Sequence, residues 1–303
     1  MTPGLENAPT GPCFVGRGAQ LARIGKAQAA ALGHGRQMVC EVVGEPGIGK
    51  TRFVREALER CAPTVPWAVG TCAPDERGVP FHVFRHALTK GQPPRRGLRA
   101  GRPAPTWAEP AGAVPPASDA RRFRTYQAAR RLIGLAARDG LVVVLDDLHW
   151  ADPASVRLLQ FVTRHTWFER LLFVGTYRDA EVESGEHPLR PLLVPLSAKA
   201  TTVTLTGLGR DDVAALMTRT AGREPGADLV AEVHRRTGGN PFFVEQTARL
   251  WHTDGLTDTI APGVREVVRR RLDQLTAPVV EALTVAAVLG HEFDRGTVAA
   301  CVP

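Results

Sequence analysis

The sequence is poor in the features that mark membrane, secreted and disulfide-stabilised proteins. Its densest apolar runs, residues 141–145 and 279–289, are much shorter than the roughly 20 residues that a transmembrane helix needs. The first residues, MTPGLENAPTGP, have neither the basic nor the apolar region of a secretory signal. The five cysteines are widely spaced and include no CxxC pair, which argues against a disulfide framework or a zinc knuckle. These absences predict a cytoplasmic protein with reduced thiols and no membrane partner.

Lysine is also scarce, because 34 of the 38 basic residues are arginine. The formal net charge is +7, and a basic balance can favour nucleic acid. The arginines are scattered along the chain, and the abundant alanine, glycine and proline beside them are typical of a GC-rich coding sequence. A charge total is a weak indicator of nucleic-acid binding, so that alternative stays open.

The composition is that of a globular protein with about two domains' worth of chain: 303 residues, 44% hydrophobic and 23% charged. In the first two thirds, short apolar segments alternate with helical patterns, which predicts βαβ units on a parallel sheet. Residues 91–116 are dense in proline and glycine and predict a mobile loop. The expected strands are 37–43, 67–70, 141–145, 171–175 and 203–205, and the expected later helices are 210–220, 227–236, 241–252, 264–275 and 278–289.

A phosphate-binding loop is the strongest motif. Residues 44–51 read GEPGIGKT and fit GxxxxGK[ST], with an apolar segment before them and a helical pattern after them. The glycines let backbone amides wrap around an anion, and the following helix directs its free N–H groups at the same point. We expect Lys50 to reach the β- and γ-phosphates and the Thr51 hydroxyl to bind Mg²⁺. The predicted nucleotide-binding residues of this loop are Gly44, Glu45, Pro46, Gly47, Ile48, Gly49, Lys50 and Thr51.

Two carboxylates, Asp146 and Asp147, directly follow the apolar run 141–145. Ligands of parallel sheets bind beyond the carboxyl ends of the strands, so these side chains are expected near the phosphates. We predict that Asp146 holds Mg²⁺ together with Thr51, and that Asp147 orients the attacking water. His149 could touch these carboxylates, although a packed structural histidine is the plainer interpretation.

The next expected strand continues into the polar residues TYRD. If this strand neighbours the one before Asp146, Thr176 and Arg178 lie beside that carboxylate, where a polar group could sense the γ-phosphate. The alternative is that Arg178 pairs with Asp179 or Glu181 on the surface. Arg178 is therefore a candidate catalytic residue with an open alternative.

These motifs occur together with further blocks, and as a set they resemble the nucleotide-binding module of STAND-type AAA+ ATPases. The resemblance is especially to the N-terminal ATP-binding region of large LuxR-family transcriptional regulators. It implies a P-loop, AAA+-like α/β core with a parallel sheet and flanking helices, then an all-helical lid and the start of a winged-helix-like domain. The blocks are FVGR (14–17), the phosphate loop, DDLHWAD (146–152), GTYR (175–178), GGNPFFVE (238–245) and the segment 264–293.

The resemblance also implies a ligand and a domain organisation. ATP or ADP with Mg²⁺ is expected between core and lid, where it sets an off/on switch with slow hydrolysis. The family's FVGR block lines the adenine, which implies Val15, Gly16 and Arg17, and its lid Gly-x-Pro approaches the adenine, which implies Pro241. Gly18 departs from the family's acidic residue. The implied domains are a tail at 1–12, a core at 13–207, a lid at 208–260 and a truncated winged-helix-like segment at 261–303.

We therefore predict an ATP-binding regulatory module with slow ATPase activity, part of or derived from a LuxR-family regulator. The family's helical repeats and DNA-binding helix-turn-helix have no counterpart before Pro303, so its transcriptional output is not carried over. The expected partners are the nucleotide and either a protein or a second copy of the chain, bound through the lid and the third segment. A different function, that of an AAA+ ATPase of the origin-binding or DNA-loading type, stays open because such proteins share the FVGR motif. The motifs are also compatible with an interaction domain that holds nucleotide without turnover, and with an incomplete gene product.

Overall fold

A computed structural model describes residues 14–35, 37–61, 65–77, 79–89, 126, 129, 133, 140–165, 170–183, 187–254, 272 and 275–289. The predicted tail, the proline-rich stretch at 91–116 and most of the helix expected at 264–275 lie outside these residues. Among the helices that are described, none combines the length and the apolar character that crossing a membrane requires.

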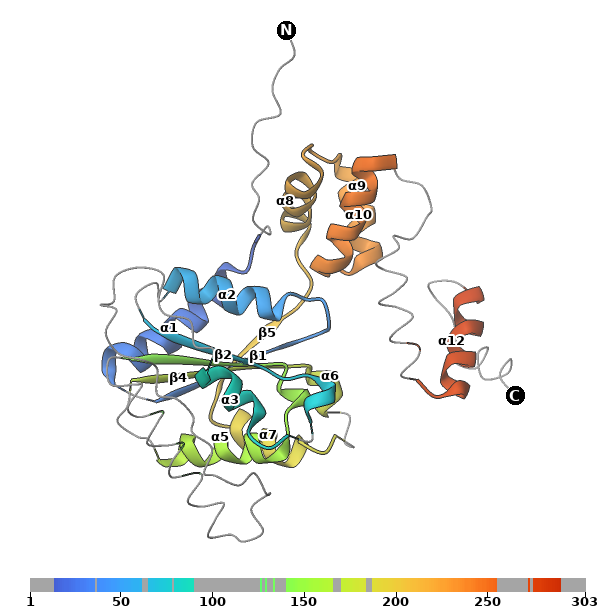
Figure 1. Ribbon diagram of the computed structural model, residues 1–303. Coiled ribbons are helices and arrows are strands. Elements are labelled where there is room, and N and C mark those ends of the chain that lie inside the picture. Colours follow the sequence, from blue (N-terminus) through green and yellow to red (C-terminus); the bar gives the residue numbers. More distant parts are fainter. Residues whose placement is uncertain are drawn as a thin grey trace.

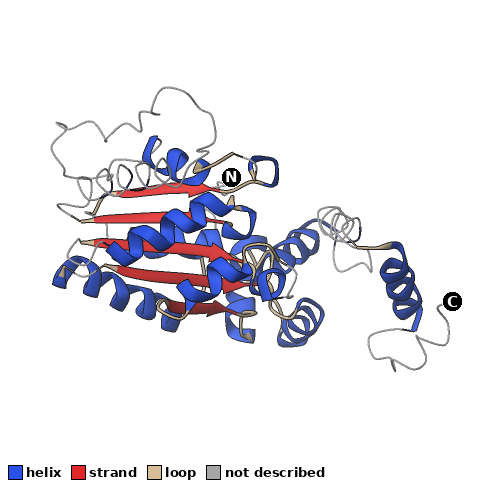
Figure 2. Ribbon diagram, turned by 90° about the horizontal axis from the view of Figure 1, so that it is seen from below, coloured by secondary structure: helices blue, strands red, loops and turns tan. Residues whose placement is uncertain are grey.

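Five parallel strands form one sheet in the order β2-β3-β4-β1-β5 (Figures 1 and 2). All five predicted strands are present, and the strand expected at 171–175 extends two residues further. β4 lies between β1, which leads into the phosphate loop, and β3, which leads into the two carboxylates. The bounds are β1 (Met38–Gly44), β2 (Trp67–Thr71), β3 (Leu141–Asp146), β4 (Leu171–Tyr177) and β5 (Thr201–Leu205).

The central strands β3 and β4 are mostly apolar because helices cover both faces of the sheet. Every residue of β3 (LVVVLD) and of β4 (LLFVGTY) is buried. The two edge strands, β2 and β5, contain partly exposed positions. The strands that carry the candidate site therefore lie in the best-packed part of the protein.

Two helical layers enclose the sheet (Figure 1). α1 (Gly18–His34) and α2 (Lys50–Cys61) pack on one face. α3 (His82–Thr89), α5 (Pro153–His165) and α7 (Arg190–Ser197) pack on the other. Both clusters are built from the aliphatic side chains that β1, β3 and β4 present alternately to the two faces.

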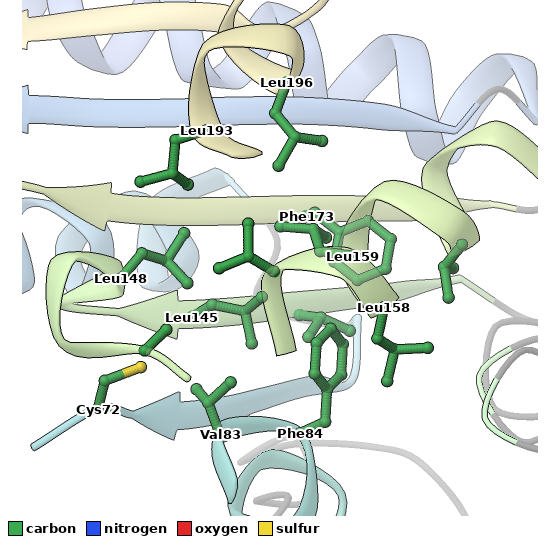
Figure 3. Packing of buried hydrophobic residues seen from close by; sticks show 14 of the residues in the cluster. Cys72, Val83, Phe84, Leu145, Leu148, Leu158, Leu159, Phe173, Leu193 and Leu196 are labelled. Carbon is green, nitrogen blue, oxygen red and sulfur yellow. The ribbon is translucent and has the colours of Figure 1, made fainter. Parts of the chain in front are cut away.

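On the α5 face, large apolar side chains from each helix pack toward the central strands (Figure 3). Phe84 comes from α3, Leu158 from α5 and Leu193 from α7, and they share a cluster with Leu145 and Phe173 of the sheet. The sequence analysis did not predict α7, which contains two prolines.

Three helices follow the sheet and form a lid with its own small core: α8 (Arg210–Ala221), α9 (Ala227–Thr237) and α10 (Pro241–Asp254). α12 (Ala277–Leu289) lies apart from both layers in Figures 1 and 2. Two short helices directly follow the strands of the site: η3 (Leu148–Trp150) comes after β3, and α6 (Asp179–Glu183) comes after β4. The buried residues of the lid core are Leu208, Val213, Leu216, Met217, Val230, Val233, Val244 and Ala248.

Candidate functional site

The predicted phosphate loop connects the end of β1 to the first residue of α2. Gly47 and Gly49 adopt φ values of +79° and +94°, a region that favours glycine. The buried Lys50 Nζ donates to the carbonyl oxygens of Gly44 at 2.8 Å and Glu45 at 3.0 Å. Burial lowers the pKa of Lys50, and the charge of Asp147 opposes that shift. Two neutral carbonyls do not neutralise an ammonium group, so the loop and this side chain together favour an anionic ligand.

One carboxylate of the site is oriented by hydroxyl groups from two other elements. Thr51 Oγ1 donates to Asp146 Oδ2 at 2.8 Å, and Thr176 Oγ1 donates to Asp146 Oδ1 at 2.5 Å. The backbone N–H of Asp147 donates to the same Thr176 oxygen at 2.9 Å. Mg²⁺ prefers oxygen ligands. The pairing of a threonine hydroxyl with a buried carboxylate therefore fits the predicted magnesium ion.

Asp147 has an uncommon backbone conformation for a residue other than glycine. Its φ of 58° and ψ of 47° lie in the left-handed region, and its side chain borders the pocket. Burial and the charge of Asp146 raise the pKa of Asp147, while Arg178 and Lys50 oppose the shift. A carboxylate with a raised pKa beside a phosphate loop is suited to accept a proton from water.

Arg178 pairs with Glu181, as one of the two interpretations left open by the sequence expected, while its sensing of a γ-phosphate stays a prediction. It lines the same pocket as Asp147, and its Nη1 donates to Glu181 Oε1 at 2.5 Å. His149 is completely buried between carboxylates, with Nδ1 3.9 Å from Asp147 Oδ1 and Nε2 3.8 Å from Glu181 Oε2. Burial, with the charges of Arg178 and Lys50, lowers the pKa of His149 to about 3.

A pocket of about 400 Å³ lies between the phosphate loop, the N-terminal segment 14–17 and the lid. This volume is in the range of small-molecule sites. Four of the predicted binding residues do not line the pocket: Gly16, Gly44, Glu45 and Asp146. The carbonyl oxygens of Gly44 and Glu45 accept hydrogen bonds from Lys50, and Asp146 accepts one from Thr51, which does line the pocket. The lining residues are Phe14, Val15, Arg17, Pro46, Gly47, Ile48, Gly49, Lys50, Thr51, Arg52, Phe53, Asp147, Arg178, Leu208, Leu216, Pro241, Phe242 and Glu245.

The segment 14–17 joins the core to the lid. Val15 packs against the lid core, and Arg219 Nη1 of α8 donates to the carbonyl oxygen of Phe14 at 3.1 Å. A Cβ at Gly16 would meet the Asp212 carboxylate, which could move aside, and φ there is +65°, so the backbone conformation favours glycine. Gly16 thus lies against Asp212 of α8 and does not line the pocket, so its predicted contact with the adenine stays a prediction.

Asn240 is a functional candidate that the sequence analysis missed. This buried side chain donates through Nδ2 to the carbonyl oxygen of Pro46 at 3.1 Å and accepts from the Phe242 backbone N–H at 3.2 Å. It therefore caps the start of α10 and attaches the lid to the phosphate loop. An asparagine before a proline is a helix N-terminus signal, which could have indicated the cap but not its contact with Pro46.

Comparison with known proteins gives a family and a fold. The family described as AAA ATPase domain matches residues 13–174. An uncharacterized protein of Rhizobium meliloti (strain 1021) is 26% identical over an alignment of 332 positions, which covers 96% of this chain and 31% of that protein. The chain thus spans about a third of the length of this curated relative.

Three solved structures share the fold at low sequence identity. The Aeropyrum pernix ORC2 protein has a TM-score of 0.56 at 14% identity, covering 95% of this chain and 79% of that one. The Aeropyrum pernix ORC1 protein in complex with DNA has a TM-score of 0.52 at 16% identity, covering 98% and 78%. A point variant of Thermotoga maritima RuvB has a TM-score of 0.50 at 16% identity, covering 92% and 83%. The predicted P-loop AAA+ fold is confirmed by these likenesses.

Proposed function

The chain belongs to the AAA ATPase domain family, and on that premise we propose that it is a nucleotide-dependent switch. It binds MgATP or MgADP between a core at 13–207 and a lid at 208–260, and it hydrolyses ATP slowly. The observation that carries this proposal is a pocket bordered by the phosphate loop, by Asp147 and Arg178, and by lid residues.

Each residue of the core side has a distinct part in this proposal. The loop amides and Lys50 hold the phosphates, and Thr51 and Asp146 hold Mg²⁺, which when bound offsets phosphate charge. Asp147 orients the attacking water and accepts its proton, and Arg178 stabilises the charge that develops on the γ-phosphate.

The base end is assigned to the segment 14–17 and the lid. Val15, Arg17 and Pro241 border the pocket, with Leu208 and Leu216 adding apolar surface suited to an adenine ring. Because α8 and α10 belong to the lid, a ligand that contacts these residues and the phosphate loop would couple the lid position to the nucleotide state.

The direct test is the nucleotide content and turnover of the purified, dialysed protein. Denaturation and chromatography of the released material should identify bound ADP or ATP, and added MgATP should yield slow phosphate release. Bound nucleotide without any hydrolysis of ATP would indicate, instead of a slow ATPase, an interaction domain that holds nucleotide. Absence of both bound nucleotide and ATP binding would overturn the proposal.

Two roles for the switch have separate support. An origin-binding or DNA-loading role is supported by the fold likeness to the ORC2 and ORC1 proteins, of which ORC1 was solved with DNA. A role in a LuxR-type regulator is supported by the DDLHWAD and GGNPFFVE blocks of the sequence. The structural comparisons favour the first role over the second.

DNA dependence of the ATPase separates these roles. A DNA-loading protein should hydrolyse ATP faster with duplex DNA, and the effect should fall steeply between about 50 and 200 mM salt because phosphate contacts release counterions. A rate that is unaffected by DNA at low salt would remove the DNA-loading role and favour a regulator that responds to a protein or small-molecule signal.

A further inference from the structure

Arg178, the expected phosphate sensor, is already paired with a carboxylate. Its Nη1 lies 2.5 Å from Glu181 Oε1, three residues along the chain in α6. The two side chains are 26% and 36% exposed, so solvent screens the pair and its net free energy is small. A weak ion pair can be exchanged for a stronger ligand, and a phosphate with its higher charge is such a ligand.

The second oxygen of the same carboxylate faces His149. Glu181 Oε2 lies 3.8 Å from His149 Nε2, beyond hydrogen-bond distance. His149 has no exposed surface, and among the described residues neither of its ring nitrogens has a hydrogen-bond partner. Buried polar atoms without partners are uncommon and costly. Glu181 therefore lies between a cation that holds it now and a buried histidine that lacks a partner.

On the basis of the proposed function, we propose that Glu181 competes with the γ-phosphate for Arg178. When Arg178 binds the phosphate instead, Glu181 forms a hydrogen bond with His149. A movement of roughly 1 Å would bring Glu181 Oε2 within hydrogen-bond distance of His149 Nε2. Both are positioning residues, because they act through Arg178 and not on the nucleotide.

The same exchange affects Asp147. A neutral imidazole carries one N–H group and one acceptor nitrogen. When Nε2–H donates to Glu181, Nδ1 has no proton to donate to Asp147, which lies 3.9 Å away. The Asp147 carboxylate then remains available for the attacking water. Arrival of a γ-phosphate would thus, through Arg178, Glu181 and His149 in turn, prevent His149 from donating a hydrogen bond to the water-orienting group.

Glu181→Gln tests the competition, because it keeps the shape and removes the charge. The measured quantities are the Kd values for a non-hydrolysable ATP analogue and for ADP. The variant should bind the analogue about two- to fivefold more tightly, the range expected for a partly exposed ion pair, with ADP affinity unchanged. Unchanged or weaker analogue binding relative to ADP would overturn the proposal.

Glu232→Gln is the matched control. Glu232 pairs with Arg235 and Arg236 on α9, so this change also removes one carboxylate from an arginine ion pair. It should leave both Kd values unaltered. If the wild type binds neither nucleotide, the proposed function fails; if it binds both and Glu181→Gln leaves their ratio unchanged, only the present inference fails.

A double-mutant cycle tests the part of His149. His149→Ala should weaken analogue binding when Glu181 is present, because the released carboxylate loses its second partner, and should have no further effect in the Glu181→Gln background. Additive effects would show that His149 only packs. If the alanine variant does not fold, His149→Gln and His149→Asn replace it in this test. Glutamine places its amide near the Nε2 position and should retain wild-type binding of the analogue. Asparagine does not reach that position and should bind the analogue more weakly. Equal behaviour of these two variants would contradict the proposal.

Discussion

The core wall of the pocket is formed by Lys50, Thr51, Asp147 and Arg178, with Asp146 behind Thr51, and it is fixed by strands and buried hydrogen bonds. The lid wall, formed by Leu208, Leu216, Pro241, Phe242 and Glu245, is attached to the phosphate loop through the Asn240 side chain. The core wall carries charge at defined positions, whereas the lid wall is mostly apolar. The comparison teaches that the charged groups lie at a sheet edge held by buried hydrogen bonds, whereas the lid contributes mainly apolar surface and a hydrogen bond to the loop.

Lys50→Ala should have the largest effect on binding and tests the core wall first. Loss of the buried ammonium should weaken ATP binding by roughly 100-fold or more, which corresponds to about 3 kcal/mol. Titration calorimetry with MgATP measures this change. Lys199→Ala removes an exposed lysine and should bind normally. Near-normal affinity of folded Lys50→Ala would remove this side chain from the phosphate site.

Asp147→Asn should separate binding from chemistry on the same wall. The amide cannot accept a proton from water, so kcat should fall by about 100-fold or more while nucleotide Kd stays near the wild-type value. Phosphate release under saturating MgATP provides the measurement, with the exposed Asp228→Asn as the control. Equal hydrolysis by wild type and Asp147→Asn would show that Asp147 does not orient the water.

Asn240→Ala should act on the lid wall and leave the chemistry largely intact. Removal of the bond to Pro46 should raise the dissociation rate of a fluorescent ADP about fivefold, as expected for one hydrogen bond of about 1 kcal/mol. Thr247→Ala is a suitable control, because it removes a hydrogen bond within α10, to Phe243, that does not reach the loop. Identical dissociation rates in the two variants would mean that the Asn240 contact does not couple lid and loop.

The last prediction concerns how the free energy of unfolding falls at acid pH because of His149. His149 has a pKa lowered from 6.5 to about 3 by burial, so between these values the unfolded chain binds more protons than the folded chain. The stability that neutral His149 provides is present above about pH 6.5 and is lost as the pH falls, by at most about 1.4 kcal/mol per unit. Urea unfolding at pH 7 and pH 5 should show this loss. His149→Gln should reduce the slope, and an unchanged slope would contradict the assignment.

The sequence predicted the core wall well because its geometry follows from local motifs on strands. A strand that ends in two aspartates and a loop with GxxxxGK[ST] place their groups at the same sheet edge. The strand order, which puts β4 between the two, then brings Thr176 to Asp146 as expected. Motif spacing was therefore enough to predict the positions of residues that lie at or just after the end of a strand.

The lid wall was harder to predict because its contacts join residues far apart in the chain. Asn240 and Pro46 are separated by 194 positions, and no periodicity indicates that they meet. The same applies to Asp212, which lies against Gly16, and to Arg219, which binds the Phe14 carbonyl. The pairing of Arg178 with Glu181 was foreseen as an alternative, but the position of His149 beside that carboxylate depends on tertiary packing.

Amide hydrogen exchange with and without MgADP tests most directly whether one nucleotide contacts both walls. We expect the nucleotide to slow exchange at residues 44–51 of the phosphate loop and also at the start of α10, around residues 240–245. Protection of the phosphate loop alone would contradict a nucleotide held between core and lid. Protection of neither segment would contradict nucleotide binding at this site.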